Sequence, residues 1–348
     1  MSESIRRALE KIGIPGRDLY DLPTSKKTFP DGCNYRIEIS GVERPEVLEA
    51  LIDEREKRGV PVHKLVSMCM GTTLLDDDEI RRFAELAAEA EMEVIAVPGP
   101  RPSWDIGRGV ATEEGRRCGF RHRGCDQINY FLSDMMRCYD LGIRGFMVTD
   151  EGLMWIITQL KEAGELPRDI KVKVSVWTGH ANPGGAKVLE LIGADTFNPV
   201  GDLTLPMLAS IRSVVDIPMD IYIYFFESFG GGNRFWEAPE ITRIASPCYY
   251  KLEPETSSGQ AYKPWVDPGK LAFLAREKVK YAEIIRDLVE KHYPEGKLSE
   301  QGAPDLAIPE PRQNPPTFFK DVLDLRQDAA GLDHASVRNR IIYQKCPG

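Results

Sequence analysis

Residues 145–177 read GFMVTDEGLMWIITQLKEAGELPRDIKVKVSVW, and this stretch decides the fold class. Its two ends, GFMVTD and KVKVSVW, are short runs rich in apolar residues, which predict two strands. Between them, the amphipathic segment LMWIITQLKEAG predicts a helix that ends at a glycine. A strand, a helix and a second strand in succession are typical of parallel strands joined by a helical crossover.

The same alternation extends in both directions along the 348-residue chain. The other strands are expected at residues 35–40, 64–70, 93–97, 194–198, 219–226 and 248–253. Eight strand–helix units over residues 35–293 predict a closed (β/α)8 barrel of the TIM type. A doubly wound sheet is the alternative, but no GxGxxG turn follows the first strand.

The two ends of the chain fall outside this alternation. Residues 1–34 form an N-terminal segment with one short helix. Residues 294–348 are richer in proline and polar residues, and we interpret them as a C-terminal arm that lies over the barrel or over a partner subunit. A disordered tail is the competing interpretation.

The composition limits the classes of function. Hydrophobic residues make up 42% of the chain and charged residues 28%, which is typical of a globular protein. The formal net charge of −9 argues against nucleic acid or an anionic membrane as the partner. No apolar run approaches the roughly 20 residues of a membrane span, and no signal peptide is evident. Seven sparse cysteines without CxxC or zinc spacing favour reduced thiols and a cytoplasmic location.

Several predicted strands carry charged residues in the phase that faces the barrel interior. Alternate residues of a barrel strand point inward, so Glu38, Lys173 and Lys251 are expected inside. Strand seven places Asp220, Tyr222 and Tyr224 in the same phase. A structural ion pair is one interpretation, because a buried charge is costly without a partner. The other is catalytic, because two neighbouring lysines depress each other's pKa, as a Schiff-base nucleophile requires.

The predicted carboxyl ends of strands four to seven add a second group of candidates. Asp150 and His180 are candidates for acid–base catalysis, and Asn198 and Tyr222 for substrate binding. Asp150, His180 and Glu227 could together hold a divalent metal. The alternatives are an ordinary polar rim and a histidine that stabilises its own loop.

Two loops suggest that the substrate is an anion. Residues 98–125 contain six arginines, Arg101 among them, against three acidic residues, and a loop this long is typical of a lid or binding loop. After strand seven, Gly231, Gly232, Asn233 and Arg234 could bind phosphate or carboxylate through backbone N–H groups and the guanidinium. A solvated face or a subunit contact would explain the arginines equally well.

Three strings of residues carry a family resemblance. They are ERPEVLEAL at 43–51, GHANP at 179–183 and GADTFNPVGDLTLPMLASIR at 193–212. With them, residues 35–293 resemble the bacterial proteins called U32-family peptidases, a resemblance that implies a TIM-type barrel. Some members are similar to iron–sulfur proteins that use a cysteine cluster. The cysteines here are spread apart, so no iron–sulfur cluster is expected. No GxSxG occurs, and a serine triad is therefore unsupported.

We expect a single-domain barrel enzyme that acts on a small carboxylate or phosphate compound at the carboxyl-terminal mouth. A lyase, isomerase or aldolase-type reaction is the first hypothesis. The second is a metal-dependent hydrolase, either a peptidase or an amidohydrolase. The third is a non-catalytic barrel that binds a ligand or a partner. Association of like subunits through the C-terminal arm is a further expectation.

Overall fold

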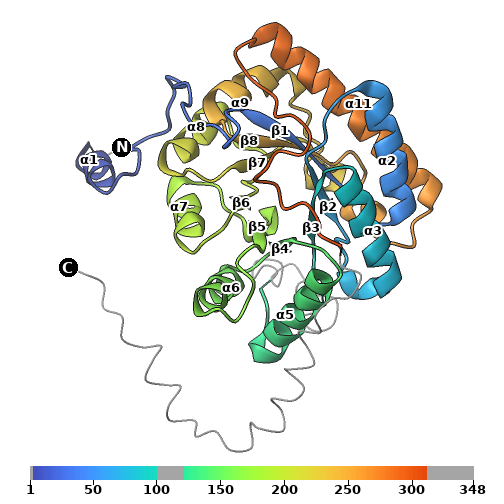
Figure 1. The fold of residues 1–348 in the computed structure, drawn as a ribbon. Helices are drawn as coiled ribbons and strands as arrows, with labels where there is room; N and C mark the ends of the chain where they lie inside the picture. Colours follow the sequence, from blue (N-terminus) through green and yellow to red (C-terminus); the bar gives the residue numbers. More distant parts are fainter. Residues whose placement is uncertain (1–2, 100–120, 312–348) are drawn as a thin grey trace, which may run out of the picture. The chain divides into compact units, whose positions relative to one another are not determined.

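The computed structural model describes residues 3–99 and 121–311. Its centre is a closed barrel of eight parallel strands, in which each strand pairs with the next in chain order (Figure 1). Closure is made by β1 and β8, which pair from Tyr35 with Cys248 to Ile39 with Leu252. The predicted TIM-type barrel is therefore confirmed.

The strands are short and follow the predicted positions. They are β1 (Tyr35–Ser40), β2 (Lys64–Ser67), β3 (Glu93–Ala96), β4 (Gly145–Val148), β5 (Lys171–Val174), β6 (Thr196–Phe197), β7 (Met219–Tyr224) and β8 (Cys248–Leu252). Most end earlier than the apolar runs do, because the last residues of those runs already belong to the loops at the barrel mouth.

Helices alternate with the strands and cover the outside of the barrel (Figure 1). The α-helices are α1 (Glu3–Lys11), α2 (Pro45–Arg58), α3 (Asp77–Glu89), α5 (Gly124–Asp140), α6 (Glu151–Ala163), α7 (Pro183–Leu191), α8 (Leu205–Val214), α9 (Ala238–Ala245), α10 (Ser258–Ala261) and α11 (Pro268–His292). Short 3-10 helices lie at η1 (Thr72–Leu74), η3 (Val176–Thr178), η4 (Glu227–Phe229) and η5 (Phe235–Glu237). No helix of the described ranges is long and apolar enough to cross a membrane.

Local sequence signals fix where several helices begin. Asp76 caps α3 in a capping box with Glu79, so the acidic run DDDE is a helix start. Asn182 accepts a hydrogen bond from the Gly185 N–H and Pro183 occupies the first turn of α7. The GHANP string is thus a strand-to-helix turn that carries His180 at its beginning.

Strand β7 contains a register shift that the sequence pattern did not indicate. The shift lies between Tyr222 and Tyr224, and it reverses the phase of the strand. Tyr222 stays with the interior, but Tyr224 stacks on Tyr281 of α11 with ring centroids 5.8 Å apart. The expectation that Tyr224 faces inward is wrong. Phe225 instead packs with Tyr222 and Val176.

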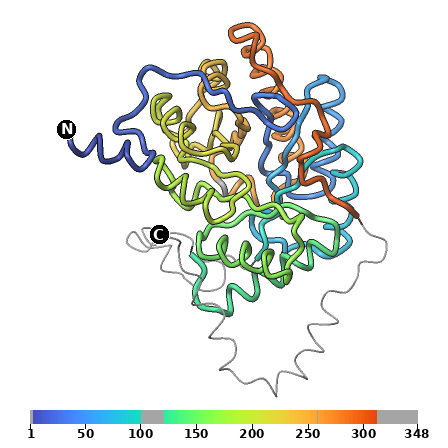
Figure 2. The backbone as a smooth tube through the Cα atoms, turned by 60° about the vertical axis from the view of Figure 1, so that its left-hand side comes forward, coloured from blue at the N-terminus to red at the C-terminus, as the bar shows by residue number. Residues whose placement is uncertain are grey.

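The two terminal segments meet at the amino-terminal end of the barrel. Figure 2 shows residues 294–311, in red, beside the blue N-terminal segment, where the Asn34 N–H donates to the Lys297 carbonyl oxygen. Arg36 of β1 pairs with Asp305 at 2.7 Å and donates to Ser299 at 2.9 Å. The first part of the expected C-terminal arm is therefore anchored to this end of the barrel, and residues 312–348 lie outside the described ranges.

Candidate functional site

Ionised side chains fill the centre of the barrel, where apolar side chains usually pack. Lys173 of β5 contacts both Glu38 of β1 and Asp220 of β7, with 2.9 Å between Lys173 Nζ and Asp220 Oδ2. Lys64 of β2 lies 3.2 Å from Asp220 and 3.8 Å from Glu38. Lys251 of β8 lies 2.9 Å from Glu38. We call these five residues the charge cluster.

Each member of the charge cluster is almost fully buried. Lys251 also lies 3.2 Å from Glu253, so three ammonium groups face three carboxylates. The ammonium of Lys64 sits 3.6 Å from the centre of the Tyr249 ring, a cation–π contact. The structure thus brings Glu38, Lys173 and Lys251 together inside the barrel, as the strand pattern predicts.

The three lysines differ in their pKa. Burial lowers the pKa of Lys173, and the neighbouring charges of Lys251 and Lys64 lower it further against the opposing effect of Asp220 and Glu38. Burial also acts on Lys64 and Lys251, but the surrounding carboxylates outweigh it and raise both pKa values. Lys173 is therefore the lysine of the cluster that most readily becomes a neutral amine.

The carboxylate of Glu38 has the opposite character. Burial alone would raise its pKa, but the charges of Lys173, Lys251 and Lys64 outweigh burial and bring the pKa to about 2. Glu38 therefore stays ionised in this site. It stabilises the surrounding ammonium groups and is a weak base.

Polar groups continue from the charge cluster toward the carboxyl ends of the strands. Ser40 lies two residues beyond Glu38, and Asn198 lies two residues beyond Thr196, which itself donates to Asp220. Both side chains are fully buried. Within the described ranges, Ser40 Oγ and Asn198 Oδ1 have no hydrogen-bond partner. The Asn198 amide is oriented, because its Nδ2 donates to the Asp220 carbonyl oxygen at 2.6 Å. Two free polar atoms thus lie on this side of the cluster.

Aromatic side chains border the same side. Tyr262 donates to Glu253, which pairs with Lys251. Tyr262 also packs with Phe226 and Met147 in one buried group at the carboxyl ends of the strands. Burial raises the pKa of Tyr222 well above its ordinary value, and the charge of Glu253 raises it further. Tyr222 is therefore a neutral hydrogen-bond donor beside the cluster.

The predicted rim residues have partners other than those expected. His180 Nε2 lies 2.9 Å from Glu151, whose carboxylate also binds Arg121 at 2.9 Å. Asp150 caps α6 by accepting from the Leu153 N–H, and it also accepts from the His122 N–H. At the rim, His180 is thus paired with Glu151, and Asp150 caps α6.

The structure does not bring Asp150, His180 and Glu227 into one group. Glu227 is exposed on η4. Across residues 3–99 and 121–311, no three histidine, cysteine, aspartate or glutamate side chains are placed to hold a metal ion.

The glycine-rich loop after β7 has a structural explanation of its own. A Cβ on Gly232 would clash with the Phe225 ring, and Gly231 has a φ of +63°. Arg234 pairs with Glu237 at 2.5 Å, and the Asn233 side chain accepts from the Phe235 N–H. The loop borders a shallow surface groove with residues 201–206. Arg101, the other predicted anion ligand, lies outside the described residues.

Sequence reasoning missed Lys64. It is the first residue of β2, where a lysine is usually taken as the solvent-exposed start of a strand. No local pattern marks it, because Lys64 reaches the cluster through the strand register that pairs it with Glu38 of β1.

Comparisons with known proteins find similarity to solved structures at low sequence identity. No family model and no curated protein matches it. The YdjI aldolase of Escherichia coli K12 is 16% identical over 75% of this chain and 93% of its own, with a TM-score of 0.44. A putative fructose-1,6-biphosphate aldolase of Coccidioides immitis is 12% identical over 75% of this chain and 91% of its own, with a TM-score of 0.45. A U32 peptidase is 15% identical over 68% of this chain and 98% of its own, with a TM-score of 0.40.

Proposed function

We propose that this protein is a barrel enzyme of the lyase or aldolase type that uses the amine of Lys173 as a nucleophile. One observation carries the proposal. Lys173 is buried between Glu38 and Asp220 with a lowered pKa, while the two neighbouring lysines stay charged. An amine of this kind is suited to attack a carbonyl group, because a neutral amine is needed and nearby cations favour it.

The chemistry requires three changes at Lys173. The ammonium first gives a proton to a carboxylate or to water, and Asp220 is the carboxylate at 2.9 Å. The neutral amine adds to the carbonyl carbon of the substrate, and loss of one water then leaves an imine. The imine withdraws electrons from the adjacent carbon, so that a neighbouring carbon–carbon or carbon–hydrogen bond can break.

The substrate class follows from the groups around the cluster. Lys64 and Lys251 supply positive charge that favours a carboxylate or phosphate on the substrate. Ser40 Oγ and Asn198 Oδ1 offer hydrogen bonds that no described residue uses. We therefore place the substrate on the carboxyl-terminal side of Lys173, with Tyr222 as a donor and with His180 and Glu151 as the acid–base pair at the rim.

The alternatives have less support. A metal-dependent hydrolase needs a ligand set, and the three predicted ligands are not brought together. Membership of the U32 group remains our proposal, supported by the GHANP and GADTFNP strings. These strings form the turn that carries His180 and the strand β6, which Asn198 follows directly.

Borohydride trapping tests the proposal. The protein is incubated with a panel of small 2-oxo acids and sugar phosphates, reduced with borohydride, and digested for mass spectrometry. We expect a substrate-derived mass on the peptide that contains Lys173, because reduction converts the imine to a stable secondary amine.

Two variants make the assay specific. Lys173→Met should lose the adduct, whereas Lys171→Met should keep it, because Lys171 lies two residues earlier on β5 and pairs with Asp195 at 3.1 Å. Circular dichroism verifies that both variants fold. A folded wild-type protein that gains no adduct on Lys173 with any member of the panel would exclude this function.

A further inference from the structure

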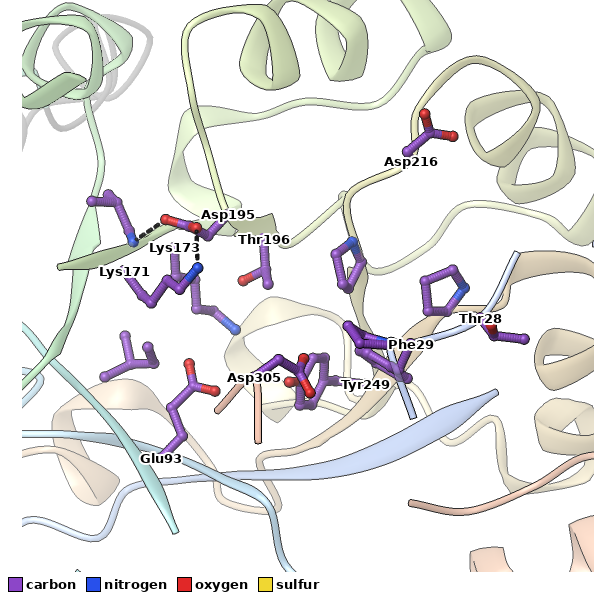
Figure 3. A pocket seen from close by; sticks show the side chains of 15 residues that line it. Thr28, Phe29, Glu93, Lys171, Lys173, Asp195, Thr196, Asp216, Tyr249 and Asp305 are labelled. Atoms are coloured by element: carbon purple, nitrogen blue, oxygen red, sulfur yellow. Dashed lines mark hydrogen bonds and ion pairs between the residues drawn. The ribbon is translucent and has the colours of Figure 1, made fainter. Parts of the chain in front are cut away.

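A cavity of about 330 Å³ opens at the amino-terminal end of the barrel, opposite the proposed substrate site. Its walls come from the starts of β3, β5 and β8, from residues 28–30 of the N-terminal segment and from Asp305 of the C-terminal segment (Figure 3). The volume lies within the usual range of small-molecule sites, about 300–1,000 Å³.

Most charged side chains that line this cavity already have a counter-charge. Lys171 pairs with Asp195 at 3.1 Å, and Lys173 belongs to the charge cluster. Asp216 pairs with Lys27 at 2.7 Å, and Asp305 pairs with Arg36 at 2.7 Å. The positive groups are therefore engaged, and the cavity offers no unpaired cation to an anionic ligand.

Glu93 is the exception. It is only 6% exposed, and its side chain points into the cavity in Figure 3. No described residue forms a hydrogen bond with its carboxylate or an ion pair within 4 Å. Burial raises the pKa of Glu93, and the nearby charges of Asp220 and Glu38 add to the effect against the opposing charge of Lys64. A buried carboxylate without a direct partner is costly, and a ligand that brings a cation would remove that cost.

We propose that this cavity is a second ligand site and that it binds a small organic ammonium compound through the carboxylate of Glu93. The ammonium group supplies the missing counter-charge and up to three hydrogen-bond donors. Much of the remaining wall is apolar, from Phe29, Ile95, Val172, Pro218 and Pro247, with Thr28, Thr196 and Tyr249 beside them. The apolar part fits a short hydrocarbon body attached to the ammonium group.

The site is distinct from the proposed substrate site. Glu93 begins β3 and faces the amino-terminal end, whereas Ser40 and Asn198 lie on the carboxyl-terminal side of the charge cluster. Lys173 lies between the two sites and also lines the cavity. A ligand at Glu93 can be measured without any carbonyl substrate, so the two proposals fail independently.

Isothermal titration calorimetry with n-butylammonium tests this site, with n-butanol and butyrate as matched neutral and anionic probes. We expect the wild-type protein to bind n-butylammonium at least tenfold more tightly than n-butanol and to show no binding of butyrate. Equal binding of n-butylammonium and n-butanol, or no binding of n-butylammonium at concentrations of about 10 millimolar, would overturn the proposal.

Two variants assign the binding to Glu93. Glu93→Gln keeps the shape and removes the charge, and it should weaken n-butylammonium binding at least tenfold. Asp216→Asn is the control, because Asp216 lines the same cavity but already pairs with Lys27, and its affinity should stay within twofold of wild type. Unchanged binding by Glu93→Gln would overturn the assignment. The comparison of the three probes on the wild-type protein decides the matter even if this variant does not fold.

Discussion

Replacing Lys64 by methionine, alone and together with Asp220→Asn, tests whether ion pairing holds the barrel centre together. The Lys64 and Asp220 side chains are fully buried and lie 3.2 Å apart. At this distance two unit charges attract by about 5 kcal/mol for an effective dielectric constant of about 20. Loss of Lys64 alone leaves an excess negative charge inside the barrel, which costs roughly 3–5 kcal/mol.

The double variant removes one charge of each sign and leaves the cluster balanced. Lys173 and Lys251 then still face Glu38 and Glu253. We therefore expect the double variant to lose less free energy of unfolding than the two single variants lose together. The difference should be about 2 kcal/mol or more.

Urea unfolding at neutral pH, followed by circular dichroism, measures the four free energies of unfolding. The exposed pair Arg81 and Asp78, 2.6 Å apart on α3, is the control, with Arg81→Met and Asp78→Asn. The interaction energy between Arg81 and Asp78 should stay below about 1 kcal/mol, because solvent screens the charges. If the losses of unfolding free energy in the two single variants add up to that of the double variant within about 0.5 kcal/mol, Lys64 and Asp220 do not stabilise each other and the reasoning fails.

Four further outcomes are expected. Burial lowers the pKa of His63 to about 4, so stability should fall by about 3 kcal/mol as pH drops from 6.5 toward 4, and His63→Gln should flatten this part of a pH series of urea melts. Glu93 has a raised pKa, and the charged groups near it are Lys64, Asp220, Glu38 and Arg36. Its contribution to the free energy of unfolding is therefore present below pH 4.5 and is lost as pH rises. Glu93→Gln should therefore be more stable than wild type at neutral pH, and a lower midpoint would contradict this. Gly232→Ala should lower the free energy of unfolding by roughly 1–3 kcal/mol, because its Cβ would meet the Phe225 ring, and an unchanged thermal midpoint would argue against that contact. Arg36→Met should release residues 299–311 to limited proteolysis, since Asp305 and Ser299 lose their partner, and unchanged digestion would show another anchor.

The strand pattern alone determined the barrel and the phase of three of its interior charges. Apolar runs at regular spacing predicted eight strands, and their alternation predicted that Glu38, Lys173 and Lys251 point inward. The inward direction could be predicted because residues of a barrel strand alternate between two faces. Once the apolar residues are assigned to the outer face, the charged residues between them must point inward. Helix starts are local in the same way, since the Asp76 and Asn182 side chains each accept from the N–H three residues further on.

Only the tertiary structure decided which charges meet. Lys64 joins the cluster through the register between strands, which no local pattern encodes, and the shift in β7 turns Tyr224 away from the interior. The partner of His180 is Glu151, because the turn after β5 brings its ring to the start of α6. The Glu93 cavity exists because two terminal segments about 275 residues apart close over one end of the barrel, and contacts over that separation leave no trace in the local sequence.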